Sequence, residues 1–200
     1  ITRDSNGQIT QIVNQDLNLN SIVRSGIDVG LEYRFDAPAF LSSTGKMDFR
    51  LFYSRLIDFY TDFAGIDGVT RTDSKGEIGA WKNTGQMQLG YRDGPLRLRW
   101  KARYTGPAVD SNIRLANAES VGSNPPFLHV GSRVRHDFYL SFDLDPDQLG
   151  EMRFYTGVNN AFNSRSPFLP SGTVQGGSNN FSGYYDIIGR YVYAGFEVKF

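Results

Sequence analysis

Few side chains in this sequence have the type and spacing that catalysis requires. The chain has no Cys, which excludes a disulfide framework, a thiolate metal site and a Cys nucleophile. Its only histidines are His129 and His136, and the pair His136-Asp137 suggests an acid–base dyad. Neighbouring residues on a strand point to opposite faces, however, whereas a dyad needs two side chains within hydrogen-bond reach. A hydrolase would need His136 and another acid to converge in one cleft, so we predict no catalytic residue, no cofactor and no enzymatic activity.

A segment rich in oxygen ligands includes Asp67-Gly68 and the run Asp73-Ser74-Lys75-Gly76-Glu77. Closely spaced carboxylates are typical of calcium loops, but this spacing does not fit the EF-hand pattern. Two His without Cys also make a poor transition-metal site. We therefore interpret the segment as a polar loop and expect no metal.

Four cations, at positions 97, 99, 101 and 103, alternate along one short segment. Alternation places Arg97, Arg99, Lys101 and Arg103 on one face of a strand. A small dry core cannot hold four cations, so this face must meet water or paired acids such as Asp48. We interpret the row as a hydrated wall with salt bridges, in preference to a dedicated track for anions. The whole chain carries 21 acidic and 21 basic residues, so nothing indicates a nucleic-acid partner.

These residues lie in a series of segments in which apolar and polar residues alternate, the pattern of half-exposed β-strands. The clearest runs from Val23 to Phe35, with Leu31 and Tyr33 on one face and Glu32 and Arg34 on the other. Between two of the segments, Asp93-Gly94 predicts a tight type I′ hairpin turn. Seven strands are expected, over residues 23–35, 47–59, 87–91, 96–104, 136–144, 152–159 and 192–200.

The connections between these strands alternate in length. Those at 36–45, 93–94 and 145–150 are short, and the others, at 60–79, 105–132 and 161–183, are long and polar. Outer-membrane barrels have short periplasmic turns and long outer loops. No apolar run approaches the roughly 18 residues of a membrane-spanning helix. We therefore predict an all-β fold, a transmembrane antiparallel β-barrel whose apolar face meets outer-membrane lipid and whose C-terminus is periplasmic.

The strand count bears on completeness. Seven strands that begin outside the cell cannot close antiparallel, so we expect residues 1–200 to be the C-terminal portion of a larger barrel. Residues 1–20 would then be an extracellular loop with a small hairpin at Asn6-Gly7, and residues 21–200 would form strands and loops. The alternative is a complete eight-stranded barrel with a structural or adhesive role, in which residues 8–15 form a further strand. We favour seven strands because Gln8 to Asn20 is polar and lacks a lipid-facing set.

Four segments carry a family resemblance that extends over nearly all of the chain. FYTGVNNAFN (154–163) is similar to a strand that ends in Gly-x-x-Asn-Leu-Phe, with Ala161 in place of Leu. In this order and with these gaps, the segments resemble the C-terminal half of the barrel of TonB-dependent receptors. The other three segments are SGIDVGLEYRF (25–35), WKNTGQMQLGYRDGPLRLRWKARYTG (81–106) and YDIIGRYVYAGFEVKF (185–200).

The resemblance implies a barrel of about 22 strands around an N-terminal plug domain. Such receptors lie in the Gram-negative outer membrane and take up scarce nutrients, of the siderophore-iron, cobalamin or carbohydrate class, with energy delivered by TonB. The sequence contains neither the plug nor the short box that contacts TonB, so the resemblance implies that TonB would act through sequence outside these residues.

Two sets of residues are candidates for recognition. The C-terminal pattern of Tyr193, Gly195, Val198 and Phe200 resembles the signal that the barrel-assembly machinery recognises, for which strand addition gives a physical rationale. The long loops are where a nutrient would first be met, because loops commonly carry recognition. The candidate ligand contacts are their aromatic residues Phe63, Phe127, Phe181 and Tyr184.

Overall fold

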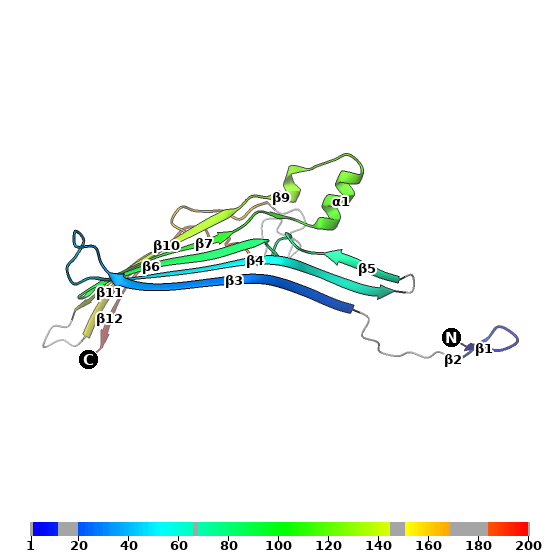
Figure 1. Cartoon of the computed structure of the whole chain (residues 1–200), viewed down its shortest axis with the longest axis horizontal. Coiled ribbons are helices and arrows are strands. Elements are labelled where there is room, and N and C mark those ends of the chain that lie inside the picture. The colour runs from blue at the N-terminus through cyan, green and yellow to red at the C-terminus, as the bar shows by residue number, and fades with distance from the viewer. Residues whose placement is uncertain (1, 12–19, 66–67, 145–150, 169–183, 200) are drawn as a thin grey trace.

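The computed structural model describes residues 2–11, 20–65, 68–144, 151–168 and 184–199, and most of them belong to one large antiparallel sheet (Figure 1). Seven long strands follow one another across this sheet in chain order, so each pairs with its sequence neighbours. They are β3 (Asn20–Asp36), β4 (Lys46–Gly65), β6 (Asn83–Asp93), β7 (Leu96–Thr105), β10 (Arg133–Leu144), β11 (Glu151–Asn159) and β12 (Tyr191–Lys199).

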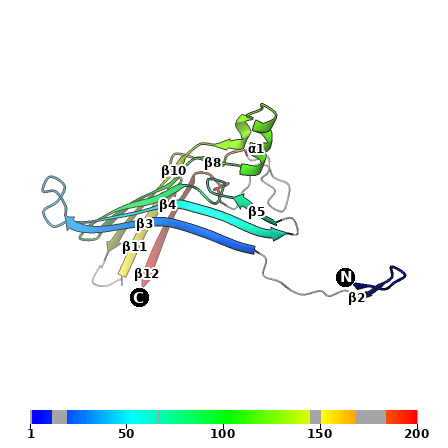
Figure 2. The same ribbon diagram turned by 45° about the vertical axis from the view of Figure 1, so that its right-hand side comes forward.

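The expectation of an all-β antiparallel fold is confirmed, and seven long strands lie where seven were expected, but the large sheet has an eighth member, β5 (Gly68–Asp73). Within the described residues, β3 and β12 each pair on one side only. The strands change direction steadily from β3 to β12, so the sheet is twisted and curved (Figure 2). In the part of the chain that the structure describes, no helix is long and apolar enough to cross a membrane.

The register gives the sheet two chemically different faces. One row of residues that face each other across the strands is apolar in all seven strands. The neighbouring row, displaced by one residue along each strand, consists of charged residues, Tyr and Gly. The apolar row is Tyr33, Phe49, Leu89, Trp100, Phe138, Val158 and Val192. The second row is Arg34, Asp48, Gly90, Arg99, Tyr139, Gly157 and Tyr193. We call these sides the apolar face and the polar face.

Neither face is covered by a second layer of described residues. Large side chains of the apolar face stay open, for example Leu31, Phe196 and Val192, with exposed fractions of 52%, 59% and 66%. The described hydrophobic residues that are buried are small in number and lie in connections or at strand ends: Ala37, Ala80, Ala108, Leu128 and Val130. The sheet therefore has no conventional core among the described residues.

The two ends of the sheet differ. The β3–β4 and β6–β7 connections lie at one end, the turn end, on the left in Figure 1, and the long connections leave from the other, the loop end. The predicted type I′ geometry of the β6–β7 turn is wrong. Asp93 pairs with Leu96, so the central residues are Gly94 and Pro95. Gly94 has φ 51°, while a Pro ring fixes φ near −65°, so the pair fits a type II′ turn, which needs Gly first.

The long connections contain more regular structure than expected. Residues 60–79 were predicted to be a loop, but β4 runs on to Gly65 and pairs with β5 (Gly68–Asp73), which makes a hairpin that projects from the loop end. Residues 105–132 contain β8 (Ala108–Val109), the helix α1 (Asn112–Ser120), a 3-10 turn (Pro126–Leu128) and β9 (His129–Val130). The Ser111 hydroxyl caps α1 by accepting from the Arg114 amide at 3.5 Å.

The predicted hairpin at Asn6-Gly7 is confirmed. β1 (Thr2–Arg3) and β2 (Ile9–Gln11) pair with each other, and Gly7 takes the positive φ of 82° in the turn. Residues 8–11 join this small sheet rather than the large one, whose eighth strand is β5. The remainder of the alternative strand at 8–15, like the short connection at 145–150, lies outside the described residues.

Candidate binding site

The polar face at the turn end is a network of alternating charges. Asp143 accepts from Arg153 Nε at 2.7 Å and contacts Arg97 Nη2 at 2.6 Å. Arg153 also lies 3.7 Å from Glu197 on β12. Arg97 therefore forms a salt bridge, as predicted for the cation row, but its partner is Asp143. Asp48, the predicted partner, instead lies over Gly90, where any side chain would collide with its carboxylate.

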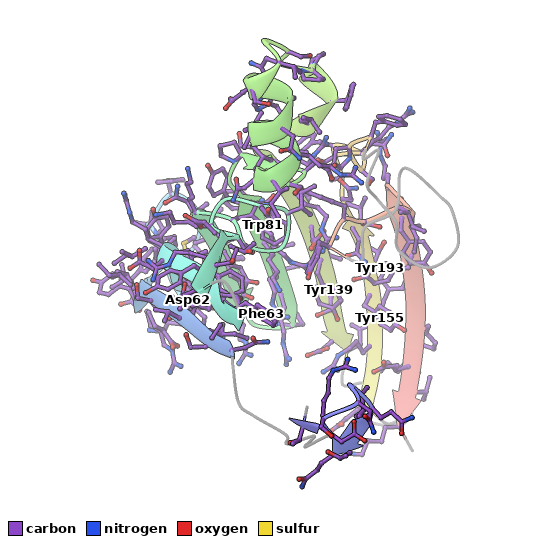
Figure 3. All side chains as sticks on the ribbon, turned by 90° about the vertical axis from the view of Figure 1, so that its right-hand side faces the viewer. Asp62, Phe63, Trp81, Tyr139, Tyr155 and Tyr193 are labelled. Atoms are coloured by element: carbon purple, nitrogen blue, oxygen red, sulfur yellow. The ribbon has the colours of Figure 1, made fainter. Side chains whose placement is uncertain are left out.

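In the middle of the polar face, tyrosine rings lie over glycines on the neighbouring strand. The ring of Tyr193 covers Gly157, and the ring of Tyr155 covers Gly195, at positions where a Cβ atom would collide with the ring. Tyr155 also lies 6.4 Å from Tyr139 and 6.5 Å from Tyr193, measured between ring centroids. Figure 3 shows the three tyrosines on adjacent strands. This interlock aligns β10, β11 and β12.

The structure divides the C-terminal pattern between the two faces. Tyr193 and Gly195 lie on the polar face and belong to the tyrosine interlock. Val198 pairs with Met152 on the apolar face. Phe200 lies outside the described residues. If the barrel-assembly machinery recognises this strand, it would meet polar-face residues on one side and apolar residues on the other. That this strand is an assembly signal stays a prediction.

At the loop end, the polar face leads into a pocket of about 210 Å³. We call it the arginine pocket, because four arginines contribute to its walls. Arg103 belongs to β7, Arg133 and Arg135 to β10, and Arg165 to the segment that follows β11. The other lining residues are Thr105, Ser164, Ser166, Tyr184, Tyr185 and Asp186.

Two carboxylates hold part of the arginine pocket in place. Asp137 Oδ2 accepts from Arg103 at 2.9 Å, and Asp186 Oδ2 accepts from Arg135 at 3.1 Å. Arg133 Nη1 donates to the backbone carbonyl of Arg165, and its guanidinium carbon lies 5.9 Å from the centre of the Tyr185 ring. Each of these three guanidiniums thus makes one hydrogen bond to described residues, although each carries five donors.

The Nε atoms of these three arginines are buried and have no hydrogen-bond partner among the described residues. A buried donor left without a partner costs about 1–3 kcal/mol, and more where the group is charged. Arg103 and Arg135 also stand directly opposite each other in the β7–β10 register, where like charges repel. The pocket therefore has unused capacity for an acceptor with negative charge.

A buried amide supports one wall of the arginine pocket. Asn160 is fully buried and has a positive φ of 51°. Its side chain accepts from the Ser164 amide at 2.7 Å and donates to the Ser164 carbonyl at 3.0 Å, while its own amide donates to Asp137 at 2.8 Å. These bonds fasten residues 160–164 to β10. This wall is therefore held in place by hydrogen bonds within the chain itself.

An aromatic cluster forms another wall. Trp81 Nε1 donates to the Tyr185 hydroxyl at 3.3 Å, and the Trp81 ring meets the rings of Tyr184 and Tyr185 edge to face. Burial raises the pKa of the Tyr185 phenol, while the Trp81 hydrogen bond and the charge of Arg133 offset part of the rise. Tyr185 is therefore a neutral hydrogen-bonding group at physiological pH.

The structure brings one of the four candidate ligand-contact aromatics to this pocket. Tyr184 lines it and packs over Gly79. Phe63 lies on the β4–β5 hairpin and Phe127 in the 3-10 turn after α1, with exposed fractions of 51% and 47%. Phe181 lies outside the described residues. The loop aromatics therefore do not form one described site.

The predicted separation of His136 and Asp137 is confirmed. His136 lies on the apolar face, where Trp100 Nε1 donates to its Nδ1 at 3.1 Å and Phe162 meets its ring edge on. Asp137 lies on the polar face with Arg103. His129 is elsewhere, with Nε2 at 2.6 Å from Asn124 Oδ1. Within the described ranges, no group of three or more His, Asp or Glu is placed to hold a metal ion.

Several residues of the arginine pocket were not singled out from the sequence. Arg133, Arg135 and Asp137 occupy alternate positions, as the cations on β7 do. This pattern could have placed all three on the polar face. Tyr185 and Asp186 follow a long connection, and no local pattern indicates that they return to β10.

No family model, curated protein or solved structure matches this chain. Its function must therefore be argued from its own residues.

Proposed function

We propose that this chain is the C-terminal portion of an outer-membrane β-barrel of the TonB-dependent receptor class, which takes up a scarce nutrient. The observation that carries the proposal is the apolar face, which is exposed and continuous across all seven strands. Lipid-facing and water-facing residues alternate along the strands of such barrels. Fully burying one Leu, Ile or Phe side chain is worth about 1.5–3 kcal/mol, so a face of this size needs a cover, and lipid supplies it.

The polar face suits the wall of a hydrated lumen. Several of its charges are paired across strands, as in the network of Asp143 with Arg97 and Arg153. Among the described residues, β3 and β12 each have one edge without a partner strand. This supports the view that further strands complete the barrel, because an open edge in lipid would leave backbone groups without partners. The loop end then faces the outside and the turn end the periplasm.

In this proposal the nutrient binds outside, at the loop end, and TonB supplies energy through a plug domain encoded elsewhere in the same protein. The nutrient belongs to the siderophore-iron, cobalamin or carbohydrate class. The barrel-assembly machinery and outer-membrane lipid are the other partners.

The test is to fractionate cells that make the protein and to measure its intact mass in purified outer membranes. We expect a protein that resists alkaline extraction, migrates faster on gels when unheated, and has a mass several times the 22.4 kDa of this chain. Uptake of the nutrient should stop when TonB is removed. Recovery in the soluble fraction would overturn the membrane proposal, and a membrane protein near 22.4 kDa would overturn the large receptor.

A further inference from the structure

We propose that the arginine pocket binds an oxyanion, a carboxylate or phosphate group of a soluble ligand. This inference deepens the proposed function, on which it rests, because it assigns an anionic group to the nutrient. The sequence led us to interpret the cations as a wall held by salt bridges. At the turn end that interpretation fits Arg97 and Arg153, which share Asp143, although Arg97 Nε also has no hydrogen-bond partner among the described residues. At the loop end three such Nε atoms belong to arginines that line one pocket, and Arg133 has no carboxylate partner among the described residues.

The balance of charge is the first support. Arg103, Arg133 and Arg135 contribute three positive charges to the arginine pocket, and Asp137 and Asp186 contribute two negative charges, which leaves one positive charge in excess. Arg165 also lines the pocket, but it is exposed and contacts Arg133 through its backbone carbonyl. An anion that enters would meet this excess inside a concave wall, where the interaction is screened less than on open surface.

The geometry of the donors is the second support. Residues at i and i+2 on a strand are about 7 Å apart and point to the same face, so Arg133 and Arg135 leave the strand side by side toward the pocket that both of them line. Arg103 faces Arg135 across the strand pair. Guanidinium groups are planar forks that match the oxygens of carboxylate and phosphate in pairs. An oxyanion held among them would accept from several donors at once and relieve the repulsion between Arg103 and Arg135.

The dimensions fit a small ligand or one group of a larger one. A volume of 210 Å³ equals that of about seven water molecules at roughly 30 Å³ each. The hydroxyls of Tyr185, Ser164 and Thr105 line the same space and add neutral hydrogen-bonding groups.

A free solute suits the pocket better than a lipid headgroup. The strand residues that form it, Thr105 and Arg103 on β7 and Arg133 and Arg135 on β10, belong to the polar face. A phosphate on a membrane lipid would approach from the apolar face, on the other side of the sheet. The occupant is therefore an anion that reaches the polar face through water.

Trp81 provides a direct probe of occupancy. The chain has two Trp, and Trp81 donates to Tyr185 in the pocket wall, whereas Trp100 lies on the apolar face. In the Trp100→Phe variant, Trp81 is the one indole of these 200 residues. Its fluorescence is followed in the whole protein, purified in detergent, during titration with citrate, with inorganic phosphate and with uncharged glycerol. The same titration of a variant that carries both Trp100→Phe and Trp81→Phe measures the fluorescence of any Trp outside these 200 residues, and this background is subtracted.

We expect a saturable change with citrate or phosphate, none with glycerol, and weakening as salt is raised. Arg133→Gln is the main variant, because Arg133 has no carboxylate partner among the described residues and its loss leaves the ion pairs of Arg103 and Arg135 intact. It should weaken binding about tenfold, the effect of losing a charged hydrogen bond. Arg153→Gln, the matched control at the turn end, should leave binding unchanged.

Equal binding by Arg133→Gln and the parent would overturn the inference, as would the absence of a saturable signal with both anions. A response only to vesicles that carry lipid A phosphates would overturn the assignment to a soluble ligand. Failure here is distinct from failure of the proposed function: a protein found in the outer membrane at high mass without anion binding keeps the function and loses the inference.

Discussion

The two faces of the sheet are built on the same strands, yet they depend on different kinds of contact. The apolar face is made of side chains that are exposed in the described chain and differ in shape, such as Leu31, Phe196 and Val192. The polar face is made of specific partners, such as Tyr193 over Gly157 and Asp143 between two arginines. The comparison teaches that the apolar face is defined by hydrophobic character, whereas the polar face is defined by which residue stands opposite which.

The largest effect is expected from a charge on the apolar face. Leu89→Arg should destabilise the barrel in lipid by about 2–4 kcal/mol, because Leu89 lies in the middle of β6, in the apolar row. Gln88→Arg places the same charge on the polar face, opposite Arg50 and Lys101, and the repulsion between these cations should cost no more than about 1 kcal/mol. Denaturant unfolding in lipid vesicles measures both. Equal costs would contradict the assignment of the faces.

A second test enlarges a glycine under a tyrosine. Gly195→Val should destabilise by about 1–3 kcal/mol, because its side chain would collide with the Tyr155 ring. The matched change on the apolar face is Ala194→Val, one residue away, and it should be neutral or slightly stabilising since Val favours strands. The same unfolding assay distinguishes them. Stabilisation by Gly195→Val would mean that the interlock has no energetic role.

A third test removes the acid of the turn-end network. Asp143→Asn leaves Arg97 and Arg153 without their shared carboxylate, and we expect a loss of about 1–2 kcal/mol, since the Asp143 side chain is 27% exposed and thus only partly desolvated. At the loop end, Asp186→Asn removes the closer of the two carboxylates beside Arg135 and leaves Asp137 at 3.9 Å, so it should instead tighten anion binding. A loss of anion affinity in Asp186→Asn would show that the two ends of the polar face do not differ in this way.

The smallest effect is local and depends on pH. In the β4–β5 hairpin, Arg71 binds both carboxylate oxygens of Asp62, at 2.7 and 2.8 Å, and this holds the pKa of Asp62 below its ordinary value of 3.8. A lowered pKa stabilises the folded hairpin above pH 3.8, and this contribution is lost as the pH falls through the lowered value. Figure 3 shows Asp62 beside Phe63 on β4.

Amide hydrogen exchange measures this effect. We expect the amides of β5 to be protected at pH 6 and to exchange faster relative to the intrinsic rate below pH 3.8. Asp62→Asn should show the faster exchange at both pH values. Unchanged protection of β5 in Asp62→Asn would mean that strand pairing alone holds the hairpin.

The strands could be predicted because alternation is a local signal, and each of the seven was found within a few residues of its bounds. The extension of β4 to Gly65 was missed because Thr61 to Gly65 looks like polar loop, and its partner β5 alone supplies the reason for a strand there. The helix α1 was missed since nine residues with mixed polarity give almost no periodicity. The arginine pocket depends on Tyr185 and Asp186 meeting β10, a long-range contact that no local pattern encodes.

The order of strands across the sheet has a consequence for how the structure is made. Among the described residues, long strands that are neighbours in the chain are also neighbours in the sheet, and β3 and β12 at its two ends have one such partner each. The contacts that build the sheet therefore span short stretches of sequence. Topologies of this kind need little loop-closure entropy for each step and favour fast folding. Each hairpin can form on its neighbour as soon as that neighbour is in place, and a defect in one strand stops growth at that point while leaving the earlier hairpins paired.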